Sequence, residues 1–218
     1  MKKLVCMMLM VVALTAHAEN PYKKYTANLP FKMPEVKAPV IPNRQVNLRD
    51  FGAVDDGVTL NTQAFAKAID ALSKQGGGRL VVPQGVWFTG PIVLKSNIDL
   101  HLEVGAVIQF SGDDTLYPII NTSFEGLDTR RCQSPLSANG AVNIAITGRG
   151  VIDGNGQFWR PVKKSKVTDA QWKEIMSRPG GVEMKKGYWV PNQGYVQGEK
   201  GANMNVPNAQ TEEEWNAI

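Results

Sequence analysis

The sequence has very few residues of the kinds that crosslink a fold or bind a metal. Its 218 residues include only two cysteines and two histidines. Cys6 falls in an apolar N-terminal stretch that we expect to be removed, which leaves Cys132, and one thiol forms no internal disulfide. No spacing typical of a zinc site or a calcium loop occurs. We therefore expect no metal and no cofactor, and a packed core must stabilise the chain, which is long enough to bury one.

The chain also lacks a strong excess of charge. The 24 basic residues stand against 20 acids, and without Lys2 and Lys3 the excess falls to two. Such a balance gives no electrostatic footprint for nucleic acid or for steering toward a polyanion. After the N-terminal stretch no apolar run approaches the length of a membrane span, so we expect no membrane anchor.

Residues 1–18 have the pattern of a signal peptide. Lys2 and Lys3 precede the apolar run 4–14, and residues 15–18 read Thr-Ala-His-Ala, a small-residue cleavage site. The run is too short for a permanent membrane span. We therefore predict export, with cleavage near Ala18 and release to the periplasm or the cell exterior.

Three further segments follow the signal. Residues 19–45 contain five prolines and no apolar period, which indicates an extended arm. Residues 46–160 form the predicted folded region, and residues 161–218 a helix and loop insertion. The folded region contains one helix, on which Phe65, Ile69 and Leu72 recur at helical spacing. Asn61 or Thr62 is the expected N-cap, and the three glycines 76–78 are the expected end.

Short apolar runs follow that helix, separated by glycine, proline and asparagine. The expected strands are 80–82, 86–88, 92–94, 98–102, 106–110, 142–146 and 151–152. They are too close together for crossover helices. An antiparallel sandwich or barrel and a parallel β-helix both suit this spacing. The preceding helix favours the β-helix, because it can cover the open apolar end of the stack.

The insertion has a different texture. A capping box at Thr168–Gln171 predicts a short helix, and the glycine- and proline-rich residues 182–210 predict a long loop. A second capping box spans Thr211–Glu214, and the sequence ends four residues later at Ile218. A helix that begins so near the end indicates a truncated chain.

Four stretches together resemble the N-terminal part of glycoside hydrolase family 28, the polygalacturonases and rhamnogalacturonan hydrolases. They are Asp50-Phe51-Gly52-Ala53 with the helix, the glycines 76–78 leading to Pro83-x-Gly85, Leu100-x-Leu102-x-x-Gly105-Ala106, and Gly148-x-Gly150-x-Ile152-Asp153-Gly154-x-Gly156-x-x-Trp159. The resemblance covers residues 46–160. It implies an all-β fold, a right-handed parallel β-helix with an N-terminal capping α-helix, and a monomer that acts on pectic polysaccharide.

The resemblance also implies inverting hydrolysis by separated carboxylates. The family's Asn-Thr-Asp, Gly-His-Gly and Arg-Ile-Lys motifs do not occur here, so we assign no catalytic residue and expect no pectin cleavage by this chain alone. A polysaccharide lyase of β-helix type, and a non-catalytic β-helix for carbohydrate binding or adhesion, remain as alternatives.

The candidate site residues each have a structural alternative. Arginine binds carboxylates in bidentate fashion, so Arg131 and Arg160 are the candidates for substrate binding. Acidic residues at Asp55, Asp56, Asp113, Asp114 and Asp153 lie in turn sequences and are expected to shape turns. His101 alternates with Leu100 and Leu102, and is expected to point away from them. Aromatic residues that could stack on sugars are Trp159, Trp172, Tyr188, Trp189 and Tyr195.

Overall fold

A computed structural model describes residues 22–200 and 209–217. The predicted signal peptide lies outside these residues. The chain divides into two compact units, Met1–Pro39 and Val40–Ile218. The described part of the first unit contains one short helix, α1 (Lys23–Thr26). The boundaries that we predicted between arm, folded region and insertion remain predictions.

No helix within the described ranges is long and apolar enough to cross a membrane.

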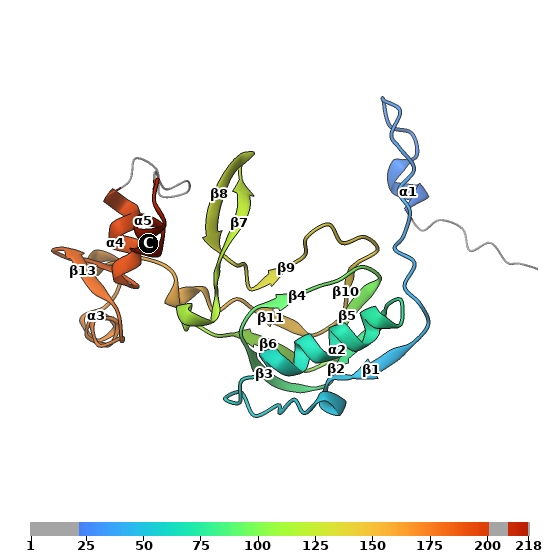
Figure 1. Ribbon diagram of the computed structural model, residues 1–218, viewed down its shortest axis with the longest axis horizontal. Coiled ribbons are helices and arrows are strands. Elements are labelled where there is room, and N and C mark those ends of the chain that lie inside the picture. The colour runs from blue at the N-terminus through green and yellow to red at the C-terminus, as the bar shows by residue number, and fades with distance from the viewer. Residues whose placement is uncertain (1–21, 201–208, 218) are drawn as a thin grey trace, which may run out of the picture. The chain divides into compact units, whose positions relative to one another are not determined.

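Three parallel sheets build the β-helix of the second unit, as Figure 1 shows. The first sheet has the order β1 (Gln45–Asn47), β2 (Gly78–Val82), β5 (Ile98–Leu102), β10 (Ala145–Gly148). The second sheet has the order β3 (Gly85–Thr89), β6 (Ala106–Phe110), β11 (Val151–Asp153). The third sheet pairs β4 (Ile92–Val93) with β9 (Leu136–Ser137). Successive strands of the chain belong to different sheets, so the chain coils in rungs. This is the parallel β-helix that the short strands predicted.

The register of the sheets places apolar side chains of successive rungs on one another. Leu80 pairs with Leu100, and Trp87 pairs with Ile108. All four of these side chains are fully buried. Strands of this kind alternate inward and outward residues, so the inward row of each rung lies on the inward row of the next. The buried residues of these rungs form one continuous core.

Helix α2 (Thr62–Lys74) covers one end of this stack, and it contacts strands of the first rungs. Phe65, Ile69 and Leu72 are buried, as their spacing predicted. The helix ends at Lys74 with Gln75 as its C-cap, and Gly76 and Gly77 follow with positive φ. Asn61 holds the N-cap position, as predicted, but its side chain makes no capping hydrogen bond. It binds the preceding loop instead, as argued in the Discussion.

One strand differs from its expected position. We expected a strand over 142–146, but β10 begins at Ala145. Asn143 adopts the left-handed conformation (φ 53°), and its side-chain amide donates to Asn97 Oδ1 (3.1 Å). The chain therefore still turns at Asn143, and strand pairing begins two residues later.

Two insertions leave the rungs. The first is an antiparallel hairpin of β7 (Ile119–Phe124) and β8 (Leu127–Cys132), which we did not predict. The second contains β12 (Val162–Lys163), the predicted helix α3 (Asp169–Met176), β13 (Val182–Lys185), β14 (Tyr188–Val190), α4 (Gln193–Lys200) and α5 (Glu212–Ala217). The long loop expected over 182–210 is therefore wrong for its described part. The antiparallel sheet β12–β14–β13 orders it, and Trp189 and Val190 of β14 are buried.

Four 3-10 helices complete the described elements. They are η1 (Leu48–Phe51), η2 (Asp114–Leu116), η3 (Gly156–Phe158) and η4 (Lys164–Lys166). Two of them, η2 and η3, follow β6 and β11 directly, so they lie where the second sheet ends. The site described next is built at this edge.

Candidate functional site

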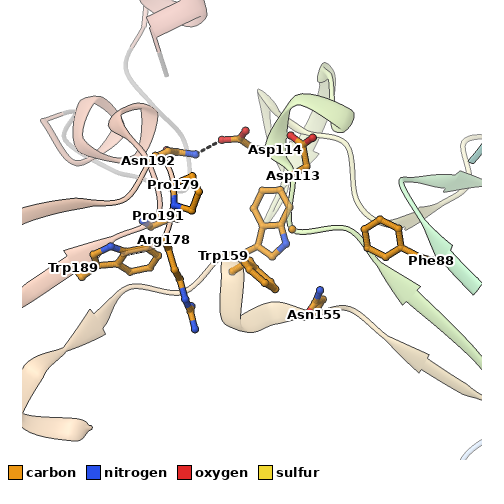
Figure 2. Close-up of a pocket in the computed structure, with 13 residues that line it drawn as sticks. Phe88, Asp113, Asp114, Asn155, Trp159, Arg178, Pro179, Trp189, Pro191 and Asn192 are labelled. Carbon is orange, nitrogen blue, oxygen red and sulfur yellow. Dashed lines mark hydrogen bonds between the residues drawn. The ribbon is translucent and has the colours of Figure 1, made fainter. Parts of the chain in front are cut away.

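A cavity of about 520 Å³ lies beside the carboxyl ends of β3, β6 and β11. The β-helix contributes the side chains of Phe88, Asp113, Asp114, Asn155, Phe158 and Trp159. The second insertion contributes Arg178, Trp189 and Asn192, together with three further residues. Figure 2 shows these side chains around the space, with Trp159 near its centre. A concave site that combines aromatic faces with a few polar groups is the usual form of a ligand site.

The first wall is the turn after β6. Asp113 Oδ1 accepts hydrogen bonds from the Thr115 amide (3.0 Å) and hydroxyl (2.7 Å), which caps η2. The predicted turn at Gly112-Asp113-Asp114 is thus confirmed. Gly112 also permits a close approach, because a Cβ at this position would lie 2.4 Å from the Phe158 ring. The sequence did not indicate that the two carboxylates would line a cavity.

The second wall is the turn after β11. Asp153 Oδ1 accepts from the Asn155 amide (2.9 Å), as predicted for an acid in a tight bend. Asn155 has positive φ (51°) and η3 follows it. This geometry brings Trp159 against Tyr117, with ring centroids 5.1 Å apart in an edge-to-face arrangement. Aromatic pairs favour that arrangement.

Tyr117 supports the Trp159 ring from below the cavity. Its hydroxyl donates to the Ser111 carbonyl (2.8 Å), and its side chain is 3% exposed. Burial, with the nearby Asp113 charge, raises the pKa of Tyr117 to about 12. The buried phenol and its hydrogen bond hold the ring in place against Trp159.

The third wall belongs to the insertion. Arg178 follows α3, and its guanidinium lies 5.4 Å from the Phe158 ring centroid and 5.8 Å from that of Trp189. It donates to Glu174 Oε1 (3.1 Å) and to the Gln157 carbonyl (3.1 Å). The Trp189 ring packs on Gly181, where a Cβ would lie 2.2 Å from the indole nitrogen. Within the described part of the chain, the indole nitrogens of Trp159 and Trp189 are buried without a hydrogen-bond partner.

The two predicted substrate arginines do not meet. Arg131 lies on β8, 4.1 Å from the Phe124 ring centroid, and lines a separate hollow of about 880 Å³ beside the hairpin. Arg160 is exposed and lines neither this hollow nor the cavity described above. Their binding role remains a prediction.

His101 has a defined environment away from the cavity. Its Nδ1 lies 2.7 Å from the Thr147 hydroxyl, which donates to the buried Asp99 (2.7 Å), and Arg79 pairs with the same carboxylate (2.7 Å). Leu100 and Leu102 are buried on the opposite face of the strand, as predicted. This polar row binds neighbouring rungs to one another. Asp56 has a comparable structural role, because hydrogen bonds from Val58 and Thr59 lower its pKa.

The five predicted aromatic residues also separate. Trp159 and Trp189 line the cavity, and Tyr195 lines a smaller one of about 360 Å³ on the other side of Asn192. Trp172 and Tyr188 line neither. Sequence reasoning missed Arg178 and Asn192. Arg178 stands in an Arg-Pro-Gly-Gly stretch, a local pattern typical of the end of a helix.

No group of three or more histidine, cysteine, aspartate or glutamate side chains in the described ranges is placed to hold a metal ion.

Comparison with known proteins extends this picture. No protein-family model matches the chain. A probable polygalacturonase of Vitis vinifera is 40% identical over 52% of this chain and 25% of its own length. An exo-poly-α-D-galacturonosidase of Dickeya chrysanthemi is 41% identical over 51% of this chain and 19% of its own. The crystal structure of an exopolygalacturonase from Thermotoga maritima is 38% identical, covers 80% of this chain and 38% of that one, and superposes with a TM-score of 0.55.

The chain is similar to polygalacturonases, the enzymes that its sequence resembles. Its fold is the right-handed parallel β-helix that the resemblance implied. This polygalacturonase-like chain spans about a quarter or less of the two curated relatives, and 38% of the solved structure. What the whole enzymes do is therefore taken up as a proposal.

Proposed function

We propose that this chain is part of an exported, pectin-degrading glycoside hydrolase that cleaves galacturonic-acid-containing polysaccharide with inversion. The observation that carries this proposal is the 38–41% identity to proteins named polygalacturonase, exopolygalacturonase or galacturonosidase. The cavity supports it, because aromatic faces beside charged groups suit a sugar acid.

The chain's own share in this activity is binding and support. The catalytic motifs implied by the family resemblance do not occur among its residues. We therefore propose that helix α2 covers the stack, that the rungs support the fold, and that the cavity contacts substrate. The 218-residue chain alone should not hydrolyse pectin. Arg131 and Arg160 remain candidates for contacts to a longer polysaccharide, and the longer enzyme is expected to be a monomer.

A product analysis tests this proposal. The polypeptide encoded by the whole reading frame and the 218-residue chain are each incubated with polygalacturonate and with neutral galactan. We expect new reducing ends from polygalacturonate with the longer polypeptide only, without unsaturated products that absorb ultraviolet light. Unsaturated products would assign a lyase instead. Binding without cleavage by the longer polypeptide would assign a carbohydrate-binding or adhesive protein.

Export is tested separately. Cell fractionation and N-terminal sequencing of the mature protein should find it outside the cytoplasm and beginning at Glu19. An intact N-terminus in the cytoplasmic fraction would contradict export, and it would leave the enzymatic proposal untouched.

A further inference from the structure

Two aspartates line one side of the cavity, and an arginine that is ion-paired with Glu174 lines the other. Asp113 and Asp114 stand on the turn after β6, and Arg178 stands on the insertion. Figure 2 shows the two carboxylates on one side of Trp159 and the guanidinium on the other. Arg178 is partly buried, whereas Asp113 and Asp114 are exposed. Acidic and basic groups on opposite sides of a cavity favour one orientation of a charged ligand.

Arg178 is held in place but keeps hydrogen-bonding capacity. Its side chain is 20% exposed and sits near the Phe158 and Trp189 rings. Three hydrogen bonds, two to Glu174 and one to the Gln157 carbonyl, use three of its five N–H groups. A guanidinium that is fixed by packing loses little side-chain freedom when it binds a carboxylate.

The two aspartates on the other side of the cavity have hydrogen-bond partners of their own. Asp113 accepts its hydrogen bonds from Thr115 in its own turn, and Asp114 accepts from Asn192. Neither carboxylate is paired with Arg178 across the cavity. A ligand carboxylate near Asp113 and Asp114 would be repelled, whereas hydroxyl groups can donate to both of them.

We propose that Arg178 binds the carboxylate of a galacturonate unit and that Asp113 and Asp114 accept hydrogen bonds from its hydroxyl groups. The proposal rests on the pectin-directed function above and names the group that selects the acid. Arg178 is then a specificity residue: the cavity prefers a free uronic acid to its methyl ester or to a neutral sugar. The partly exposed Trp159 flanks the ring, and the buried Trp189 packs near Arg178.

Binding to the 218-residue chain tests this assignment without any need for catalysis. Trigalacturonic acid, its methyl ester and galactotriose are titrated by calorimetry, and the indole N–H signals of Trp159 and Trp189 are followed by NMR. Hydrogen bonds between charged partners contribute more than neutral ones, so we expect the acid to bind about tenfold or more tightly than the ester. Both indole signals should shift on binding, because both rings line the cavity.

Two variants separate recognition from support. Arg178→Gln should abolish the preference for acid over ester while ester binding remains. Arg178→Lys retains the positive charge but loses the planar guanidinium, so it should retain part of the preference. Arg149→Gln, at an exposed arginine outside the cavity, is the matched control and should bind as the parent does. Circular dichroism checks that each variant is folded.

The outcomes distinguish the two proposals. Equal binding of acid and ester by the parent chain would overturn the assignment of Arg178 and leave a pectin-directed cavity. Equal loss of acid and ester binding in a folded Arg178→Gln would show that Arg178 only supports the wall, which also overturns the assignment. No binding of any of the three sugars would overturn both the assignment and the role of the cavity in the proposed function. If Arg178→Gln fails to fold, the acid-to-ester ratio of the parent and of Arg178→Lys still decides.

Discussion

Asn192 joins the insertion to the β-helix through Asp114, although 78 positions separate them. The side-chain amide of Asn192 donates to Asp114 Oδ2 (2.5 Å). Its other end, Oδ1, accepts from the Tyr195 amide (2.8 Å), which is the pattern of an N-cap for α4. One side chain thus begins a helix and fixes the edge of the cavity.

This contact predicts a charge-dependent rescue. Asn192→Asp keeps an N-cap oxygen but places a second carboxylate against Asp114, so it should lower the free energy of unfolding by about 1 kcal/mol. Adding Asp114→Asn should restore most of the loss, because a donor and an acceptor then face each other again. Adding Asp113→Asn instead is the control and should not restore it. Urea denaturation measures all four proteins, and equal rescue by the two aspartate changes would contradict the pairing.

The buried face of α2 predicts a large loss of stability on truncation. Phe65 is fully buried between the helix and the first rungs, so Phe65→Ala should cost about 3–5 kcal/mol in the free energy of unfolding. Lys67 lies on the exposed face of the same helix. Lys67→Ala should therefore change the free energy of unfolding by less than about 0.5 kcal/mol. A small effect of Phe65→Ala in denaturant titration would show that α2 does not close the stack.

Substitutions of Asn61 test whether its side chain stabilises the preceding loop or caps helix α2. Its side chain is 2% exposed; it accepts from the Val54 amide (2.8 Å) and donates to the carbonyls of Val54, Thr59 and Phe88. Asn61→Ala removes these side-chain hydrogen bonds, although the Phe88 carbonyl still accepts from the backbone amide of residue 61, and should cost about 3 kcal/mol. Asn61→Ser, which would satisfy a helix cap, should be nearly as destabilised in a thermal melt. A serine variant close to the parent would instead support the cap that the sequence predicted.

The contrast at Asn61 shows where sequence reasoning works in this chain and where it does not. The rungs could be predicted because β2, β5 and β6 bury alternate residues and end in turn residues. The hairpin β7–β8 could not, because its strands are largely exposed and carry no apolar alternation.

The cavity lies beyond local patterns for a related reason. Its lining residues run from Phe88 to Asn192, so they meet only after three rungs and an insertion have folded. In the sequence, the residues around Arg178 have the composition of a helix end. Only the folded structure places the Phe158 and Trp189 rings beside it and shows that it faces a cavity. Local sequence therefore predicts turns such as Asp113, but not what the turns enclose.

Helix α5 predicts a pH-dependent contact with the hairpin. Arg130 donates two hydrogen bonds to Glu212 (2.6 and 2.5 Å) and lies 5.5 Å from the Trp215 ring centroid. These hydrogen bonds lower the pKa of Glu212 from its ordinary 4.5. A carboxyl group with a lowered pKa stabilises the folded state at neutral pH, and this contribution is lost as the pH falls through the folded-state pKa. Trp215 fluorescence should therefore change on acidification below about pH 4.5, and Glu212→Gln should remove that change. Glu213→Gln, on the same helix, should leave the fluorescence change intact. A change that persists in Glu212→Gln would have to come from another group, such as Glu214. Hydrogen bonds from the amides of Gln210 and Thr211 lower the pKa of Glu214.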